Sequence, residues 1–165
     1  MKPPTFDDLL SANRRYAKTA PREFDGIAHA GVAMVTCMDS RLEPLEMIGL
    51  RVGDAKILRT PGGRVTPAAL AGCIVGVHLL HVERIMIVPH TRCMMASGDD
   101  DALAARVREA TGADLGQLRP GADPDQLGRL ADDVAMLREH PLIADRAVVG
   151  GFVYDVSTGL LEQVL

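Results

Sequence analysis

The decapeptide VAMVTCMDSR, residues 32–41, decides the fold: a run of mostly apolar residues ends in a cysteine, an acid and an arginine. A short apolar run without alternation is typical of a strand covered on both faces, as in a parallel sheet. Similar runs recur at residues 55–59 (AKILR) and 84–88 (RIMIV). We therefore predict three parallel strands joined by right-handed crossovers.

Helical patterns lie between and around these strands. Thr5 and Asp8 resemble a capping box for a first helix that runs to about Lys18. Further helices are predicted over residues 45–49, 67–80, 97–110 and 124–140, and residues 147–156 and 160–164 are expected to form a terminal hairpin. The helix over 67–80 is apolar all round, which is typical of a buried helix. The sequence thus predicts one α/β domain over residues 1–165, with a central, mostly parallel β-sheet flanked by helices, an extended N-terminal helix and a C-terminal hairpin.

Composition excludes several classes of function. The chain has 165 residues, a formal net charge of −4 and 3% aromatic residues, so it offers neither the basic stripe nor the stacking platforms of a nucleic-acid-binding protein. No apolar stretch approaches the ~20 residues that span a bilayer, and residues 1–8 do not resemble a secretory signal. We therefore expect no nucleic-acid partner, no membrane association and a cytoplasmic location. The three cysteines, an odd number, are not expected to form a disulfide framework.

Three chemically reactive segments follow the predicted strands. Cys37 ends the first strand, residues 59–63 follow the second, and His90 and Cys93 follow the third. The carboxyl ends of parallel strands form one edge of a sheet, so we expect these segments to converge. Two thiolates and one imidazole suit zinc and leave its fourth tetrahedral position open. The alternative is that the cysteines are small core residues and the histidine is a satisfied polar group.

Asp39 and Arg41 lie immediately beyond Cys37. A carboxylate beside a zinc site can occupy the fourth coordination position or accept a hydrogen bond from the water there, and an arginine can hold it by a bidentate pair. The alternative is a surface ion pair of little energetic value.

Taken together, these motifs resemble those of the β-class carbonic anhydrases, most closely the small single-domain members. The resemblance rests on the Cys-x-Asp-Ser-Arg, Gly-Asp-Ala-Lys, His-Thr-x-Cys and Gly-Phe-Val-Tyr-Asp motifs at residues 37–41, 53–56, 90–93 and 151–155. It implies Zn²⁺ bound by Cys37, His90 and Cys93, with Asp39 and Arg41 as catalytic residues. The implied reaction is the reversible hydration of carbon dioxide to bicarbonate and a proton by zinc-bound hydroxide, in a homodimer or higher homo-oligomer.

The sequence also departs from the family pattern. Residues 60–63, Thr-Pro-Gly-Gly, stand where members usually have Asn-Ala-Gly, and Met94 replaces a usual glycine. Three alternatives therefore stay open: turnover of carbonyl sulfide or carbon disulfide at the same zinc site, a noncatalytic zinc-binding homologue, and a reactive Cys37 thiol. The sequence does not decide whether Asp39 binds zinc or pairs with Arg41.

Further titratable and thiol side chains were assigned from their sequence context. His29, His81 and Lys56 are candidate proton relays. Cys73, in the apolar helix, is expected to pack in the core.

Overall fold

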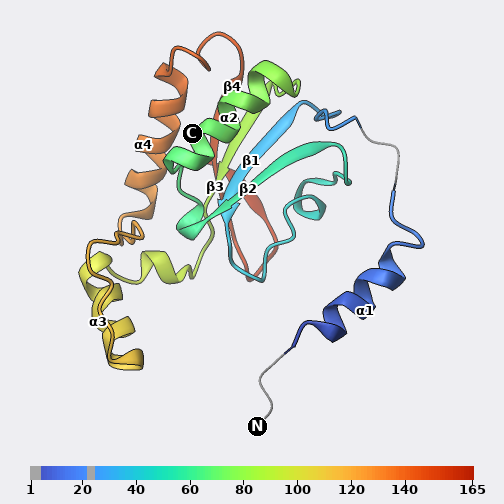
Figure 1. Cartoon of the computed structure of the whole chain (residues 1–165). Coiled ribbons are helices and arrows are strands. Elements are labelled where there is room, and N and C mark those ends of the chain that lie inside the picture. Colours follow the sequence, from blue (N-terminus) through green and yellow to red (C-terminus); the bar gives the residue numbers. More distant parts are fainter. Residues whose placement is uncertain (1–4, 22–24) are drawn as a thin grey trace.

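The computed structural model describes residues 5–21 and 25–165 and is built around a five-stranded sheet (Figure 1). The strand order is β2-β1-β3-β4-β5. The strands span β1 Val32–Cys37, β2 Ala55–Thr60, β3 Arg84–Val88, β4 Val148–Tyr154 and β5 Leu161–Gln163. The β1–β2, β1–β3 and β3–β4 pairs are parallel, whereas β4 and β5 form an antiparallel hairpin. The predicted mostly parallel sheet and terminal hairpin are both confirmed.

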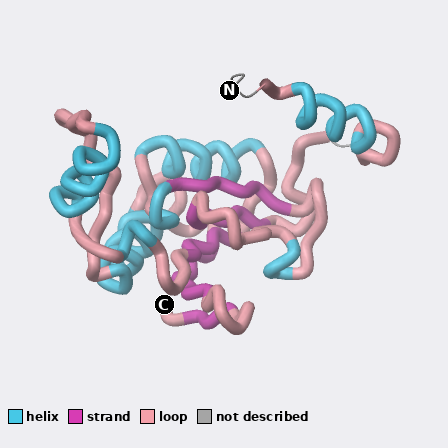
Figure 2. The backbone as a smooth tube through the Cα atoms, turned by 90° about the horizontal axis from the view of Figure 1, so that it is seen from below, coloured by secondary structure: helices cyan, strands magenta, loops and turns pink. Residues whose placement is uncertain are grey.

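Two long helices pack against the sheet and form its main core (Figure 2). They are α2, Pro67–Leu79, and α4, Gln126–Glu139. Ala69 and Cys73 of α2 and Val134 and Leu137 of α4 share one buried apolar cluster with the strands. Cys73 is fully buried, as predicted. The remaining helical elements are α1 Asp7–Tyr16, α3 Asp100–Thr111 and the single turns η1 Glu46–Ile48, η2 Pro61–Gly63 and η3 Met94–Ala96.

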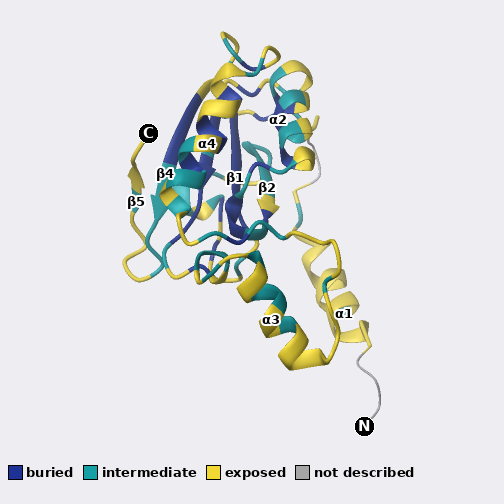
Figure 3. Cartoon of the chain, turned by 90° about the vertical axis from the view of Figure 1, so that its left-hand side faces the viewer, coloured by how far each residue is buried: buried dark blue, intermediate teal, exposed yellow. Residues whose placement is uncertain are grey.

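Helix α1 begins differently from the prediction. Its N-cap is Phe6, which makes no side-chain capping hydrogen bond, and Thr5 instead donates its hydroxyl to Asp7. The predicted capping box is therefore wrong. An aspartate three residues after a threonine is shorter than the glutamate that the motif requires. No residue of α1 is buried, and the helix stands apart from the sheet (Figures 1 and 3).

Helix α2 is apolar but is not fully enclosed by this chain. Ala69, Cys73 and Gly76 are buried, whereas Val75 and Leu79 are exposed on the outer face. With 13 residues it is too short to cross a bilayer. Within the described part of the chain, no helix combines the length and hydropathy of a membrane span.

Candidate metal centre

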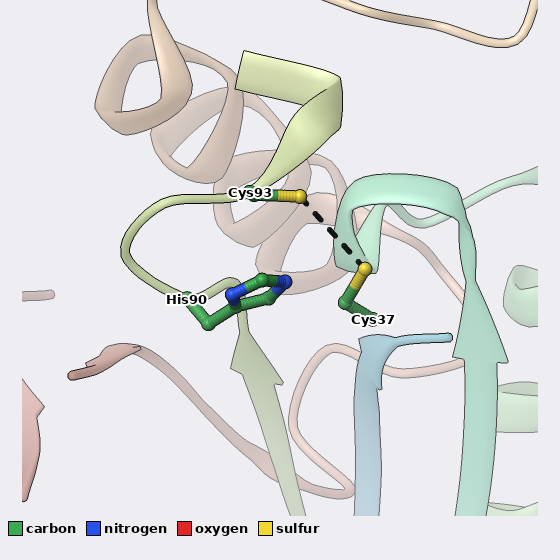
Figure 4. Close-up of side chains that lie close together, drawn as sticks. All are labelled: Cys37, His90 and Cys93. Carbon is green, nitrogen blue, oxygen red and sulfur yellow. Dashed lines mark hydrogen bonds between the residues drawn. The ribbon is translucent and has the colours of Figure 1, made fainter. Parts of the chain in front are cut away.

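Cys37, His90 and Cys93 meet at the carboxyl edge of the sheet (Figure 4). Cys37 is the last residue of β1, and His90 follows β3 by two residues. Their side-chain donor atoms and that of Cys93 all lie within 4.8 Å of one another, and all three residues are buried. This is the convergence that the parallel register predicts.

The tautomer of His90 is fixed by its backbone neighbour. The ring Nδ1 lies 2.9 Å from the carbonyl oxygen of Thr91, which can only accept, so Nδ1 carries the proton. The neutral ring then has a lone pair on Nε2. This atom is buried and has no hydrogen-bond partner among the described residues. A buried acceptor without a partner is costly, and a metal ion aligned with the lone pair would satisfy it.

The two thiols also interact directly, with their sulfur atoms 3.9 Å apart. The hydrogen bond with Cys93 lowers the pKa of Cys37, against the effect of burial, with further help from the backbone amides of Asp39 and Gly62. The same hydrogen bond, followed by burial, raises the pKa of Cys93. The opposite shifts show that the two thiols do not both ionise readily side by side, and a divalent cation between them would favour the loss of both protons.

Asp39 lies beside this cluster but is held by Arg41. Its carboxylate accepts hydrogen bonds from Arg41 Nε at 2.8 Å and Nη2 at 2.7 Å. These bonds hold the pKa of the carboxyl well below its usual range. Oδ2 of Asp39 lies 3.6 Å from Nε2 of His90. The structure thus has Asp39 paired with arginine, next to the open side of the candidate metal position.

Two further residues hold the backbone of the site: Arg59, whose segment was expected at this edge but whose contacts were not predicted, and Gln126, which sequence reasoning missed. Arg59, at the end of β2, donates from Nε to the carbonyl of Cys37 at 3.0 Å and from Nη2 to the carbonyl of Asp39 at 2.5 Å. Gln126, the first residue of α4, donates to the carbonyl of His90 at 3.1 Å. The position of Arg59 at a strand end was a usable signal, because the adjacent strand end carries Cys37. Gln126 had no signal, since its contact depends on where α4 docks.

The loop with the Thr-Pro-Gly-Gly sequence packs directly under the site. Gly63 has φ +71°, and a Cβ there would lie 3.2 Å from the carbonyl oxygen of Val88 and 3.3 Å from the amide nitrogen of Cys37. Met94, the other departure from the family pattern, is 58% exposed and lies beside Cys93 on the solvent side. The first departure therefore supports the backbone, whereas the second shapes the approach to the metal position.

The candidate proton relays lie at the opposite edge of the sheet. His29 precedes β1, His81 precedes β3, and Lys56 is the second residue of β2. Cys37 is the last residue of β1 and His90 follows the end of β3, and the six residues of β1 extend about 17 Å between the two edges of the sheet. These three side chains are not placed to relay a proton from the site within this chain.

The donor set fits zinc. Two sulfurs bound at about 2.3 Å in tetrahedral geometry lie about 3.8 Å apart, close to the 3.9 Å found here. Two thiolates and one imidazole nitrogen are ligands that zinc prefers, and three protein ligands leave one position for water or substrate. Fold and site thus define an α/β protein with a candidate Cys-His-Cys metal centre at the carboxyl edge of a parallel sheet.

Comparisons with known proteins agree with this class. A family described as carbonic anhydrase matches residues 32–161. β-Carbonic anhydrase 1 of Mycobacterium tuberculosis is 29% identical over 162 residues, which cover 96% of each chain. A carbon disulfide hydrolase of Acidithiobacillus thiooxidans is 30% identical over 179 residues, covering 94% of this chain and 79% of that protein. The crystal structure of a carbonic anhydrase from Streptococcus mutans superposes with a TM-score of 0.88 at 30% identity, covering both chains fully. The chain belongs to the β-carbonic anhydrase family.

Proposed function

We propose that the protein is a zinc-dependent carbonic anhydrase that interconverts carbon dioxide with bicarbonate and a proton. The observation that carries this proposal is the buried convergence of Cys37, His90 and Cys93 with a bare Nε2 lone pair. Membership of the family supports the same activity. Cys37, His90 and Cys93 would hold Zn²⁺ through two sulfurs and one nitrogen.

When bound, zinc lowers the pKa of water toward neutrality and supplies a hydroxide nucleophile without a strong base. The residues of the chain position that chemistry. Asp39 stays ionised because of its Arg41 partner, so its Oδ2 can accept a hydrogen bond from the reacting water and orient the attacking lone pair. Arg41 also donates to the carbonyl of Arg92 at 3.2 Å, which ties the pair to the loop between His90 and Cys93.

A hydration assay on matched proteins tests this proposal. Zinc-loaded wild type should accelerate the hydration of carbon dioxide in a stopped-flow indicator assay, and the rate should fall to the buffer background after chelation and return with zinc. Cys37→Ser should lose both zinc and activity, whereas Cys73→Ser, the matched thiol control, should keep stoichiometric zinc. Stoichiometric zinc without hydration would instead support the noncatalytic homologue. Unchanged hydration after verified metal removal would reject the proposal.

Hydrolysis of carbon disulfide is the second candidate function. The carbon disulfide hydrolase of Acidithiobacillus thiooxidans matches 94% of this chain, and Met94 makes the approach to the site more apolar than glycine would. Turnover of carbon disulfide above that of carbon dioxide would favour this function. Met94→Gly should then shift the ratio of the two rates toward carbon dioxide.

We also propose that residues 1–165 form one domain that works as a cytoplasmic homodimer. Helix α1 has no buried residue, and Phe6, Leu9, Leu10 and Tyr16 are all more than half exposed. An isolated helix of 10 residues is marginal in water, so a second copy of this chain is the partner that would stabilise it.

A further inference from the structure

An open cleft of about 400 Å³ lies beside the candidate metal position. It begins at Cys93 and Asp39 and extends to α3, which projects from the same end of the sheet (Figure 3). Its lining residues are Asp39, Arg41, Arg92, Cys93, Met94, Ser97 and Arg106. Arg106 comes from α3, an element that holds none of the candidate metal ligands.

The cleft carries an excess of positive charge. Three arginines face one carboxylate, and that carboxylate is already paired with Arg41. Two thiolates would balance the charge of Zn²⁺, so the metal would add no net charge. Within residues 5–21 and 25–165, neither Arg92 nor Arg106 forms an ion pair with an acid. Such a cleft attracts small anions.

Of the three guanidinium groups, only that of Arg106 keeps both Nε and Nη2 free of hydrogen bonds within the described part of the chain. Arg41 donates hydrogen bonds from Nε and Nη2 to the carboxylate of Asp39, and from Nη2 to the carbonyl of Arg92. Arg92 donates to the hydroxyl of Ser157 at 2.7 Å. Arg106 donates only from Nη1 to the hydroxyl of Ser97 at 3.3 Å, which leaves its Nε and Nη2 without a partner in the described part of the chain. This is the edge that binds a planar oxyanion through two parallel hydrogen bonds.

We propose that Arg106, supported by Ser97, is a docking and positioning residue for bicarbonate at the mouth of the metal centre. The inference rests on the proposed function, in which bicarbonate is the anionic reactant and carbon dioxide is neutral. Docking places the anion beside Asp39 and Arg41 before dehydration and holds it briefly after hydration. Arg106 therefore affects the binding of bicarbonate and not the attack on carbon dioxide.

Bicarbonate affinity of zinc-loaded protein tests this role. Arg106→Gln removes the charge and the guanidinium edge. Arg108→Gln is the matched control, because it makes the same charge change on the same helix in a residue that pairs with Asp114 and does not line the cleft. Two measurements are compared at mildly alkaline pH and low salt: calorimetric titration with bicarbonate, and inhibition of carbon dioxide hydration by added bicarbonate.

We expect Arg106→Gln to raise the bicarbonate dissociation and inhibition constants about three- to tenfold, the range for a charge-assisted hydrogen bond in a partly exposed site. The kcat/KM for carbon dioxide should stay within about twofold, and dehydration kcat and KM should rise together, because the overall equilibrium is fixed. Arg106→Lys should retain part of the affinity, since it keeps the charge and loses the paired donors. Unchanged constants in Arg106→Gln, or an equal rise in Arg108→Gln, would overturn the proposal. If the zinc-loaded wild type did not accelerate the hydration of carbon dioxide, the proposed function would be refuted instead. The calorimetric comparison of bicarbonate affinities would still decide the role of Arg106.

Discussion

Arg59 is the side chain that ties the end of β2 to the cysteine turn. Its two hydrogen bonds fix the carbonyls of Cys37 and Asp39, so the thiolate and the carboxylate project from one rigid segment. Groups that orient metal ligands contribute to metal affinity although they do not touch the metal.

Arg59→Lys should weaken zinc binding. Lysine keeps the charge but cannot donate to both carbonyls in the same fixed geometry, so we expect the zinc dissociation constant to rise about 10-fold or more. Competition with a chromophoric chelator measures this constant. Arg51→Lys is the control, because the Arg51 side chain makes no hydrogen bond or ion pair among the described residues. Equal zinc affinity in the wild type and both variants would contradict the positioning role.

Burial separates Cys73 from the two candidate metal ligands. Desolvation raises the pKa of Cys73 to about 11, and its side chain is fully enclosed between α2 and the sheet. We expect a thiol reagent under native conditions to label none of the three cysteines rapidly in zinc-loaded protein. After chelation, Cys37 and Cys93 should react while Cys73 stays protected until the chain unfolds, as read by mass spectrometry of labelled peptides. Rapid labelling of Cys73 in folded protein would show that the α2 core opens.

At the scale of elements, η2 packs closely against the paired ends of β1 and β3. Gly63→Ala should destabilise the fold, because the new methyl group would meet backbone atoms of Val88 and Cys37 and the residue has a left-handed backbone. We expect a loss of about 2–4 kcal/mol in the free energy of unfolding, measured in urea. Gly112→Ala is the control: its φ is +72° and its Cβ would meet nothing within 4 Å, so only the backbone cost of about 1 kcal/mol should appear. Equal losses in the two variants would exclude the steric effect.

Asp133 joins α4 to the start of α2. Its buried carboxylate accepts from Arg64 at 2.7 and 3.0 Å and from the amide of Val65 at 3.0 Å. Asp133→Leu should cost about 3–5 kcal/mol, because it leaves a partly buried guanidinium and an amide without their acceptor. Asp132→Leu, at an exposed carboxylate that pairs with Arg129, should cost less than about 1 kcal/mol. Similar unfolding midpoints for the two variants would mean that the buried pair adds no specific stability.

The sequence predicted the elements that have a strong local signal. β3 has the predicted bounds, and α2 begins after the expected Thr66 cap, whose hydroxyl accepts from Ala69. A proline or a periodic pattern of apolar residues affects only the few residues around it. Such signals therefore predict helices and strands without knowledge of the tertiary structure. The sequence could not predict the exposed outer face of α2 or the contact of Gln126 with His90. Both depend on how the helices pack against the sheet in the folded chain.

At the scale of the whole molecule, strand register explains why a site spread over 57 residues is compact. Thr36 pairs with Val88 in the β1–β3 ladder, so the residues that follow each strand emerge side by side. The Thr36 hydroxyl also donates to the carbonyl of Val88 at 2.7 Å and pins that register. Local sequence patterns were therefore enough to predict that Cys37, His90 and Cys93 meet at one edge. Whether Asp39 pairs with Arg41 could be decided only from the positions of the two side chains in the structure.

In a single copy of the chain, helix α1 leaves an apolar face exposed to water. At 100° per residue, Phe6, Leu9, Leu10 and Tyr16 fall on one face, while Ser11 lies on the opposite side. These four apolar side chains are 54–74% exposed, so docking against a second copy would remove a large apolar area from water.

We expect the wild type to sediment as a dimer at micromolar concentration. Leu9→Asp/Leu10→Asp should shift the equilibrium strongly toward monomer, since each carboxylate would have to be desolvated in the interface. Ser11→Asp should remain dimeric, because residue 11 lies on the helix face opposite the four apolar side chains. A wild type that sediments as a monomer would contradict the assembly, and a dimer unaffected by the double substitution would place the interface elsewhere, with the exposed face of α2 as the next surface to mutate.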